Sequence, residues 1–257
     1  MFLSLASGSS GNASIIQSGS TTILIDCGIS GKKLTALLDS VDISCSSIDA
    51  LLITHEHIDH TTGAGVISRR YNIPIYATNK THQSMNIGLI KDENRKIISR
   101  DSDFEIGGIG VHAFSISHDA SDPVGYSFYA DGEKYSIATD TGIMTDNVFD
   151  AISDSAYVML EANHDIEMLM HGEYPYELKK RILGERGHLS NDSAAETAVR
   201  LLENNTHNIM LSHLSDKNNL PGIAYATVKE ALNKYGAVLG SDINLSVAGR
   251  CEVTSFI

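Results

Sequence analysis

The stretch Leu51-Leu52-Ile53-Thr54-His55-Glu56-His57-Ile58-Asp59-His60 joins a short apolar run to a dense group of metal-binding residue types. The apolar run predicts the end of a buried strand. His55 and His57 are two positions apart, so on an extended backbone their side chains point to the same side and can bind one metal ion. Asp59 and His60 follow at the expected start of a helix, where they can face a second ion.

The types of donor atom limit the kind of site. Imidazole nitrogen with carboxylate oxygen suits zinc, and a set completed by water suits manganese or iron. A solvated, histidine-rich loop is the alternative, but a strand that ends directly in H-x-H-x-D-H is both dense and directional. A zincin helix is excluded, because its H-E-x-x-H pattern would need a histidine where Asp59 stands.

Composition indicates a globular protein with a substantial core. The chain has 257 residues, 42% of them hydrophobic and 20% charged, which is neither a disordered nor a fibrous composition. Its 32 acidic and 19 basic side chains give a net charge of −13. This balance argues against a broad basic face that coats nucleic acid. The unusual feature is a set of 11 histidines in a chain without tryptophan.

The cysteines and the N-terminus bear on the compartment. Cys27, Cys45 and Cys251 are far apart and form no C-x-x-C pair, so we expect neither a disulfide framework nor a thiolate zinc site. Residues 1–6 place no basic residue before their apolar run, which makes a poor signal peptide. No apolar stretch reaches the roughly 18 residues that a membrane helix needs. We expect a cytoplasmic protein with no membrane partner.

No repeat, low-complexity tract or Pro/Ser-rich linker divides the chain, so we expect one domain over residues 1–257. Strands are predicted at 13–17, 21–26, 51–53, 73–76, 111–117, 124–130, 134–139 and 157–160. Helices are predicted at 30–38, 61–71, 177–183, 190–202 and 221–235. Two strand-rich portions interleaved with helices predict an α/β sandwich.

The motif at 54–60 resembles the signature of the metallo-β-lactamase fold, and later positions of that family follow in order. His118 resembles the third histidine of the first metal site, Asp140 the carboxylate that bridges both metals, and His213 the last ligand of the second. The resemblance implies that one ion is held by His55, His57, His118 and Asp140, and the other by Asp59, His60, Asp140 and His213. It also implies a four-layer αββα sandwich with both metals at one edge of the two sheets.

Further segments narrow the resemblance: Ser7-Gly8-Ser9-Ser10-Gly11-Asn12, His118-Asp119-Ala120, Glu161-Ala162-Asn163-His164-Asp165 and Gly187-His188-Leu189-Ser190. Together they are similar to the YycJ-type branch of this fold, also called WalJ. That resemblance implies a phosphodiester-cleaving nuclease with 5′-to-3′ exonuclease activity on DNA. The tRNase Z and PhnP phosphodiesterase branches are related and also carry a histidine at the position of His188.

The implied ligands would hold two divalent metal ions, with zinc favoured over manganese or iron. Such ions lie about 3.5–4 Å apart around a hydroxide that attacks phosphorus in line. His188 belongs to neither metal set, so we expect it to donate a hydrogen bond or a proton to the phosphoryl or leaving oxygen. Helix capping beside Ser190 is the alternative role. Asp59 is the second expected catalytic residue.

Substrate contacts are expected on three segments. The resemblance implies that Asn163 and His164 line the substrate side, although a polar turn would look similar. Lys180 and Arg181 precede His188 in an acidic chain and are expected to hold a nucleic-acid backbone locally, an exposed helix face being the alternative. Residues 7–12 could cradle a phosphate with backbone amides, but they lack a lysine and P-loop spacing, so a flexible hairpin remains the simpler interpretation.

The alternatives keep the metal site and change the substrate. A PhnP-like phosphodiesterase for small molecules fits the negative charge. A tRNase Z-like RNA-processing enzyme usually carries a Gly/Pro-rich arm, which is not visible between Asp140 and His188. A non-enzymatic metal-binding scaffold predicts gaps in the ligand set, and none is found. We therefore expect a nuclease with nucleic acid as its partner, DNA in preference to RNA, and infer no stable protein partner.

Overall fold

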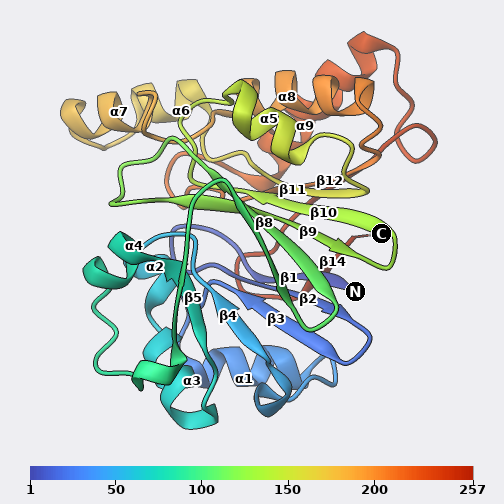
Figure 1. Ribbon diagram of the computed structural model, residues 1–257. Helices are drawn as coiled ribbons and strands as arrows, with labels where there is room; N and C mark the ends of the chain where they lie inside the picture. The colour runs from blue at the N-terminus through green and yellow to red at the C-terminus, as the bar shows by residue number, and fades with distance from the viewer. Residues whose placement is uncertain (257) are drawn as a thin grey trace.

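The computed structural model describes residues 1–256, whose strands form two seven-stranded sheets (Figure 1). The first sheet has the order β14-β1-β2-β3-β4-β5-β6. Its strands are β1 Phe2–Ala6, β2 Ala13–Ser18, β3 Thr21–Ile25, β4 Ala50–Leu52, β5 Ile75–Thr78, β6 Arg95–Ile98 and β14 Thr254–Ser255. Strands β3 to β6 are parallel, whereas β14, β1, β2 and β3 pair antiparallel. The parallel half therefore directs several carboxyl ends to one edge of the sheet.

The second sheet has the order β13-β12-β11-β10-β9-β8-β7. Its strands are β7 Ser102–Ile106, β8 Ile109–Ser115, β9 Val124–Ala130, β10 Glu133–Ala138, β11 Tyr157–Glu161, β12 Asn208–Ser212 and β13 Asn244–Val247. Strands β7 to β10 pair antiparallel, and β10 to β13 are parallel. Each sheet thus contains a parallel half whose strands end on the same side.

Helices cover the outer face of each sheet (Figure 1). Helices α1 Gly31–Asp39 and α3 Ala64–Tyr71 lie on the first sheet, and α5 Asp146–Ile152, α8 Asn191–Glu203 and α9 Pro221–Tyr235 lie on the second. The remaining helices are α2 Ile58–Thr61, α4 Asn79–Ser84, α6 Ile166–His171 and α7 Tyr176–Ile182, with single turns η1 Cys45–Ser47 and η2 Asp92–Asn94. The expected four-layer αββα sandwich is confirmed.

Alternating side chains along the central strands build three cores. In β3, Ile23 and Ile25 pack between the two sheets, while Leu24 packs under α1 and α3. In β11, Met159 faces the neighbouring sheet and Leu160 faces the helices of its own side. A strand buried on both faces reads as a continuous apolar run, which is why these runs stand out in the sequence.

The predicted helix at 61–71 is interrupted in the structure. The carbonyl of Asp59 accepts the amide of Asn12 at 2.8 Å, and the amide of Gly63 donates to the carbonyl of Cys27 at 2.8 Å. These backbone groups are consequently unavailable to a continuous helix, and α2 and α3 form separately. The sequence also gave no prediction for the short strands β1, β6, β7, β12, β13 and β14 or for helices α4, α5 and α6.

Close backbone contact at Gly28 ties the loop after β3 to α2. A Cβ atom at Gly28 would lie 1.6 Å from the carbonyl oxygen of Asp59 and 2.7 Å from the amide nitrogen of Asn12. We expect Gly28→Ala to destabilise the fold by about 3 kcal/mol or more, because backbone rather than a side chain would have to move. Thermal denaturation measures the loss. Gly108→Ala is the matched control, since nothing lies within 4 Å of its added Cβ; equal midpoints for both variants would contradict the prediction.

Candidate metal centre

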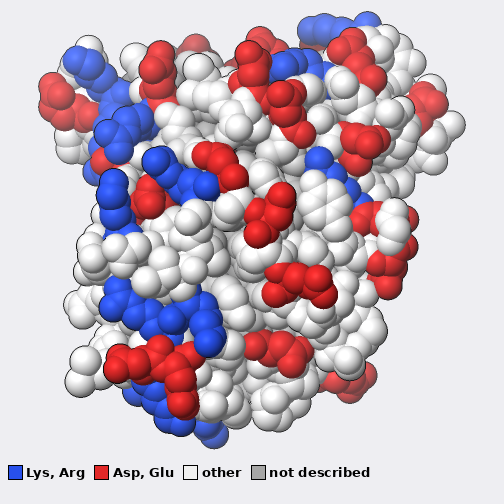
Figure 2. All heavy atoms as spheres, in the orientation of Figure 1, with Lys and Arg blue, Asp and Glu red and all other residues white. Residues whose placement is uncertain are grey.

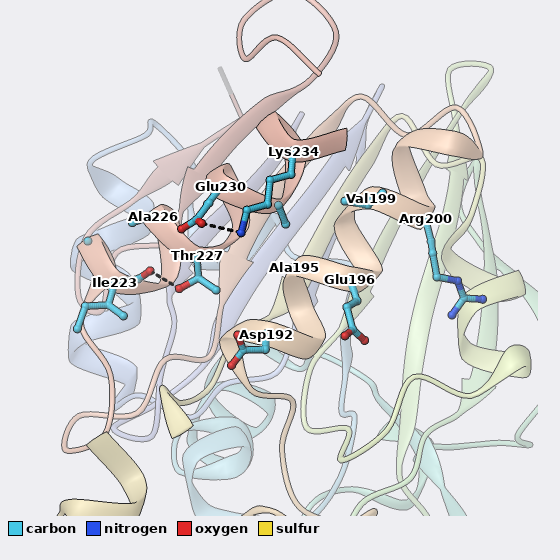
Figure 3. Close-up of a pocket in the computed structure, with 12 residues that line it drawn as sticks. Asp192, Ala195, Glu196, Val199, Arg200, Ile223, Ala226, Thr227, Glu230 and Lys234 are labelled. Carbon is cyan, nitrogen blue, oxygen red and sulfur yellow. Dashed lines mark hydrogen bonds and ion pairs between the residues drawn. The ribbon is translucent and has the colours of Figure 1, made fainter. Parts of the chain in front are cut away.

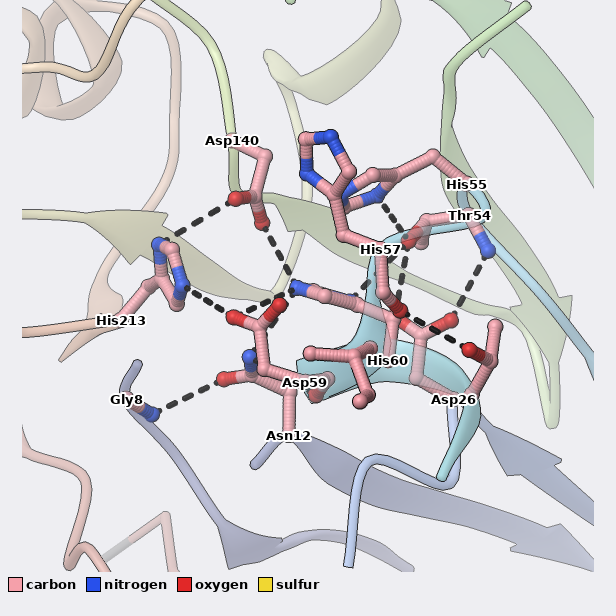
Figure 4. Close-up of polar contacts among 12 residues, drawn as sticks. Gly8, Asn12, Asp26, Thr54, His55, His57, Asp59, His60, Asp140 and His213 are labelled. Atoms are coloured by element: carbon pink, nitrogen blue, oxygen red, sulfur yellow. Dashed lines mark hydrogen bonds and ion pairs between the residues drawn. The ribbon is translucent and has the colours of Figure 1, made fainter. Parts of the chain in front are cut away.

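The candidate site lies where strands of both sheets end. Asp26, Asp140 and His213 follow β3, β10 and β12, and each has a left-handed backbone conformation with φ of 56°, 58° and 56°. Aspartate and histidine tolerate this region better than most residues. The sharp turn after each strand brings these side chains to one place, together with those that follow β4 (Figure 4).

A first cluster consists of three histidines whose ring nitrogens converge. Nδ1 of His57 lies 2.9 Å from Nε2 of His55 and 3.3 Å from Nε2 of His118. Nδ1 of His118 lies 3.1 Å from the carbonyl oxygen of Gly187, to which it can donate. Burial lowers the pKa of His55 and His118. Both rings are therefore held neutral, as metal ligands must be.

A second cluster contains Asp59, His60 and His213. Oδ2 of Asp59 lies 3.5 Å from Nε2 of His213 and 3.6 Å from Nε2 of His60. Asp140 lies between the two clusters, with Oδ2 at 3.3 Å from Nε2 of His60 and Oδ1 at 3.7 Å from Nε2 of His118. The structure thus brings together all seven residues that the sequence proposes as metal ligands.

Asp26 fixes the orientation of His60 and Thr54 through hydrogen bonds (Figure 4). Its Oδ2 accepts hydrogen bonds from Nδ1 of His60 at 2.8 Å and from Oγ1 of Thr54 at 2.9 Å, and its Oδ1 accepts the Thr54 amide at 2.9 Å. Oγ1 of Thr54 also lies 3.0 Å from Nδ1 of His55. Since a carboxylate only accepts, Nδ1 of His60 carries a proton, which leaves Nε2 as the nitrogen that would bind a metal. Asp26 was not proposed from the sequence.

Glu161 has the same role in the second sheet and was likewise not proposed. Its Oε1 lies 2.8 Å from Nδ1 of both His188 and His213, and its Oε2 accepts the amides of Thr141 and Leu189 at 2.9 and 3.2 Å. Burial would raise the pKa of Glu161, but these contacts with His188 and His213 lower it to about 2. The carboxylate is therefore ionised and directs Nε2 of each histidine away from itself.

Two buried atoms of the cluster have no hydrogen-bond partner among residues 1–256. They are Oδ2 of Asp140 and Nε2 of His213. A buried carboxylate oxygen and a buried ring nitrogen without partners are costly in a folded protein. A divalent cation with nitrogen and oxygen ligands would satisfy both. The donor set fits divalent metal ions, and the geometry supports their use by this protein.

The metal-binding cluster opens into a cavity of about 290 Å³. His57, Asp59, His118, Asp140 and His213 line it on the metal side, and His188 also faces it. Its remaining lining is Ser9, Asp119, Asn163, Tyr174, Leu178, Arg181, Ile182, Arg186, Gly187 and Ser215. A larger groove of about 860 Å³ lies between α8 and α9 (Figure 3), but its lining contains none of these histidines.

The proposed substrate contacts divide into two groups. Asn163 and Arg181 line the cavity; Nδ2 of Asn163 donates to the His213 carbonyl at 2.9 Å, and Nε of Arg181 lies 2.6 Å from Oδ2 of Asp119. Lys180 is exposed on α7 but does not line the cavity. His164 is only 1% exposed and is also absent from the lining. The structure therefore places His164 in the interior rather than on the substrate side.

The fold and this centre define a metal-dependent hydrolase of the metallo-β-lactamase fold. The chain belongs to the beta-lactamase superfamily domain family, whose model matches residues 21–213.

Within that superfamily the chain belongs with the exodeoxyribonucleases called WalJ and YycJ. It is 38% identical over 245 residues to exodeoxyribonuclease WalJ of Streptococcus pneumoniae serotype 2, covering 94% of this chain and 91% of WalJ. It is 37% identical over 241 residues to exodeoxyribonuclease YycJ of Bacillus anthracis, covering 93% of this chain and 91% of that protein. The resemblance seen in the sequence is confirmed.

Solved structures show the same fold. The metallo-beta-lactamase fold protein YhfI of Bacillus subtilis superimposes with a TM-score of 0.71 at 14% identity, covering 98% of each chain. The short form of human tRNase Z superimposes with a TM-score of 0.65 at 17% identity, covering 100% of each chain.

Among residues 1–256, no helix combines the length and the apolar character needed to cross a membrane.

We expect His164 to make the stability of the fold sensitive to acid. Both of its ring nitrogens are buried without a hydrogen-bond partner, and burial lowers its pKa from 6.5 to about 4. In the unfolded chain His164 is therefore protonated below about pH 6.5, whereas in the folded chain it is protonated only below about pH 4. The contribution of this group to stability should therefore be fully present above pH 6.5 and should fall between these values, by up to about 1.4 kcal/mol per pH unit.

We expect His164→Gln to flatten this dependence. Urea denaturation across the same pH range measures it, with a chelator in every sample so that metal release does not contribute. His171→Gln, which changes a side chain that is 80% exposed, is the control. The same loss of stability in wild type and His164→Gln would show that another group causes the sensitivity.

Proposed function

We propose that this protein is a nuclease that hydrolyses phosphodiester bonds of DNA, acting from the 5′ end. The observation that carries the proposal is the shared cavity: His188, held by Glu161, faces the same space as the metal-binding cluster. DNA is proposed as the substrate because the WalJ and YycJ relatives are named exodeoxyribonucleases. A cytoplasmic location is part of the proposal and is supported by three unpaired cysteines.

The proposed ligands of the first ion are His55, His57, His118 and Asp140, and those of the second are Asp59, His60, Asp140 and His213. Zinc is favoured over manganese or iron because imidazole nitrogens dominate the set. When bound, two such ions neutralise phosphoryl oxygens and activate water at neutral pH. The side chains then orient the substrate and move protons.

His188 is proposed to protonate the leaving oxygen. Its Nδ1 is bound to Glu161, so the ring is fixed with Nε2 toward the cavity, and its side chain is 21% exposed. Asp59 is the other proposed catalytic group, because its carboxylate lines the cavity and can accept the proton of the attacking water. The two groups account for the proton that enters and the proton that leaves.

Basic residues of the cavity lining suit a phosphate chain. Arg181 and Arg186 line it beside Tyr174 and Leu178. Figure 2 shows acidic side chains scattered over one face and basic side chains at its upper left, where Figure 1 places α7, and lower on its left side. Arg181 and Lys180 on α7 are proposed to contact the backbone of the strand near its end. Such local contacts are compatible with a net charge of −13.

A small phosphodiester is the second candidate substrate. The cavity has a volume of only about 290 Å³, and a diphosphatase of the PhnP family superimposes with a TM-score of 0.66 at 17% identity. In a DNA substrate the strand beyond the scissile bond can contribute to binding, whereas a small phosphodiester has no such strand. The RNA-processing alternative has ribose in place of deoxyribose in the substrate.

A substrate panel separates these functions. We expect the metal-loaded protein to shorten 5′-phosphorylated single-stranded DNA stepwise from its 5′ end, and to act weakly on RNA of the same sequence and on bis-p-nitrophenyl phosphate. Gel analysis of 3′-labelled strands measures the product series, and a chelator-treated sample is the control. Activity confined to the small diester would leave a phosphodiesterase in place of the nuclease, and preference for RNA would favour the processing enzyme.

His188→Ala should retain both ions and lose most turnover. We expect kcat on DNA to fall by about 100-fold or more, the usual size of a general-acid contribution. Metal content per chain, measured by mass spectrometry, should match that of wild type. His171→Ala is the control for loss of a histidine, because the His171 side chain is 80% exposed and does not line the cavity. If His188→Ala loses an equivalent of metal, His188 is a ligand rather than a proton donor.

A further inference from the structure

We propose that Tyr174, Leu178 and Ile182 form a subsite for a nucleobase of the substrate, with the base stacked on the ring of Tyr174. The inference rests on the proposed function, because it takes a nucleotide as the unit that enters the cavity. All three side chains line the cavity that His188 and the metal-binding cluster also face. We call these three residues the apolar wall.

The apolar wall is not part of the protein's interior. Its side chains belong to none of the three hydrophobic cores of residues 1–256, and each is partly exposed. Helix α7, which carries Leu178 and Ile182, contains no buried residue. Apolar and aromatic side chains that line a cavity are typical of ligand sites. Most of the remaining lining is polar or charged, so the wall is the part of the cavity that suits an apolar surface of the substrate.

Helical spacing puts a basic residue on the same face of α7 as the apolar wall. Leu178 and Ile182 are four positions apart, and Arg181 lies three positions after Leu178, so these side chains are neighbours on the helix surface. Arg181 lines the same cavity. One helix face therefore offers a guanidinium for a phosphate beside an apolar surface for a base. Basic and aromatic side chains in one groove are the combination by which proteins bind single strands.

Backbone contacts fix the apolar wall relative to His188. The amide of His188 donates to the carbonyl of Ile182 at 3.0 Å. A Cβ atom at Gly187 would lie 2.1 Å from the same carbonyl oxygen, so a larger residue there would prevent this approach. The residue proposed to protonate the leaving oxygen is thus joined directly to the wall. The base that contacts the wall consequently belongs to a nucleotide at the scissile bond.

Tyr174 is held in place by the turn before α7. Pro175 follows it and restricts Tyr174 to extended backbone. Nζ of Lys179 donates to the carbonyls of Met170 and Gly172 at 2.8 and 2.7 Å, which closes the turn on its other side. A tyrosine ring has few rotatable bonds and a large flat surface. Because its backbone is already ordered, little further entropy is lost when a base stacks on it.

A nucleobase is the ligand class that this wall fits. Every base has a flat π-face, so stacking on an aromatic ring tolerates all four bases. Stepwise removal of nucleotides requires this tolerance, because each new end of the strand presents a different base. The wall would also favour a nucleotide over a phosphodiester that has no base.

The test measures recognition of the base rather than turnover. Thymidine 5′-monophosphate and 1′,2′-dideoxyribose 5′-phosphate, which lacks the base, are titrated into the metal-loaded protein by calorimetry. We expect the wild type to bind the first probe about tenfold or more tightly than the second, and Tyr174→Ala to lose that difference, since stacking contributes on this scale. Affinity for the probe without a base, metal content and thermal midpoint should stay as in wild type.

Tyr174→Phe and Tyr176→Ala are the matched variants. Tyr174→Phe keeps the ring and should bind thymidine 5′-monophosphate as wild type does, which separates stacking from a hydrogen bond to the hydroxyl. Tyr176 is 70% exposed and does not line the cavity, so Tyr176→Ala should also behave as wild type. Equal losses on both probes in Tyr174→Ala would overturn the inference, and so would a wild type that binds both probes alike.

Failure of the base subsite is distinguishable from failure of the nuclease. Stepwise shortening of DNA, together with wild-type affinity for thymidine 5′-monophosphate in Tyr174→Ala, would refute the subsite and leave the nuclease. Base-dependent binding through Tyr174 without cleavage of DNA would refute the nuclease and leave the subsite.

Discussion

Two buried carboxylates, each at the end of a strand in one of the two sheets, orient three histidines of the centre. Asp26 follows β3 and accepts from Nδ1 of His60; Glu161 ends β11 and accepts from Nδ1 of His188 and His213. Both are almost fully buried, at 4% and 0% exposure. A buried charge requires such donors, so each carboxylate fixes the tautomer of its partners. In these three histidines Nε2 is thereby directed away from the carboxylate and toward the centre.

The strand ends supply the second requirement, which is convergence. Asp26, Asp140 and His213 each adopt a left-handed conformation just after a strand. Such conformations cost about 1–2 kcal/mol per residue, and they persist because the strands before them are locked into sheets with buried cores. Contacts within the centre offset part of that cost. The sandwich therefore fixes these three side chains before any ligand arrives, in the manner expected of a preorganised site.

The sequence was most informative where ligand spacing is local. Four ligands lie within six positions, so their spacing alone indicates which side chains can face one ion: His55, His57, Asp59 and His60. The other three were predicted only because they follow in the order of the ligand positions in the family: His118, Asp140 and His213. Asp26 and Glu161 were missed because they act through partners 34, 27 and 52 positions away. A single carboxylate at a strand end gives no sign of such a partner.

Local geometry also explains why, of two neighbouring residues predicted to contact substrate, one lines the cavity and the other does not. His164 forms an isolated bridge with Ser190, and in extended backbone the side chain next to Asn163 points the opposite way. Lys180 and Arg181 are consecutive on α7, so their side chains diverge by about 100° and only Arg181 reaches the cavity. Composition places residues near a site, but only backbone direction decides which of them faces it.

The acidic character of the chain is consistent with the way charge is arranged around the cavity. Four of the 32 acidic side chains, Asp26, Asp59, Asp140 and Glu161, are engaged with imidazoles of the centre. Two divalent ions would add about four positive charges there, and Arg181 is held at the rim by Asp119. The proposed phosphate contacts therefore lie where these positive charges are placed, at the cavity and its rim, although the chain as a whole is acidic.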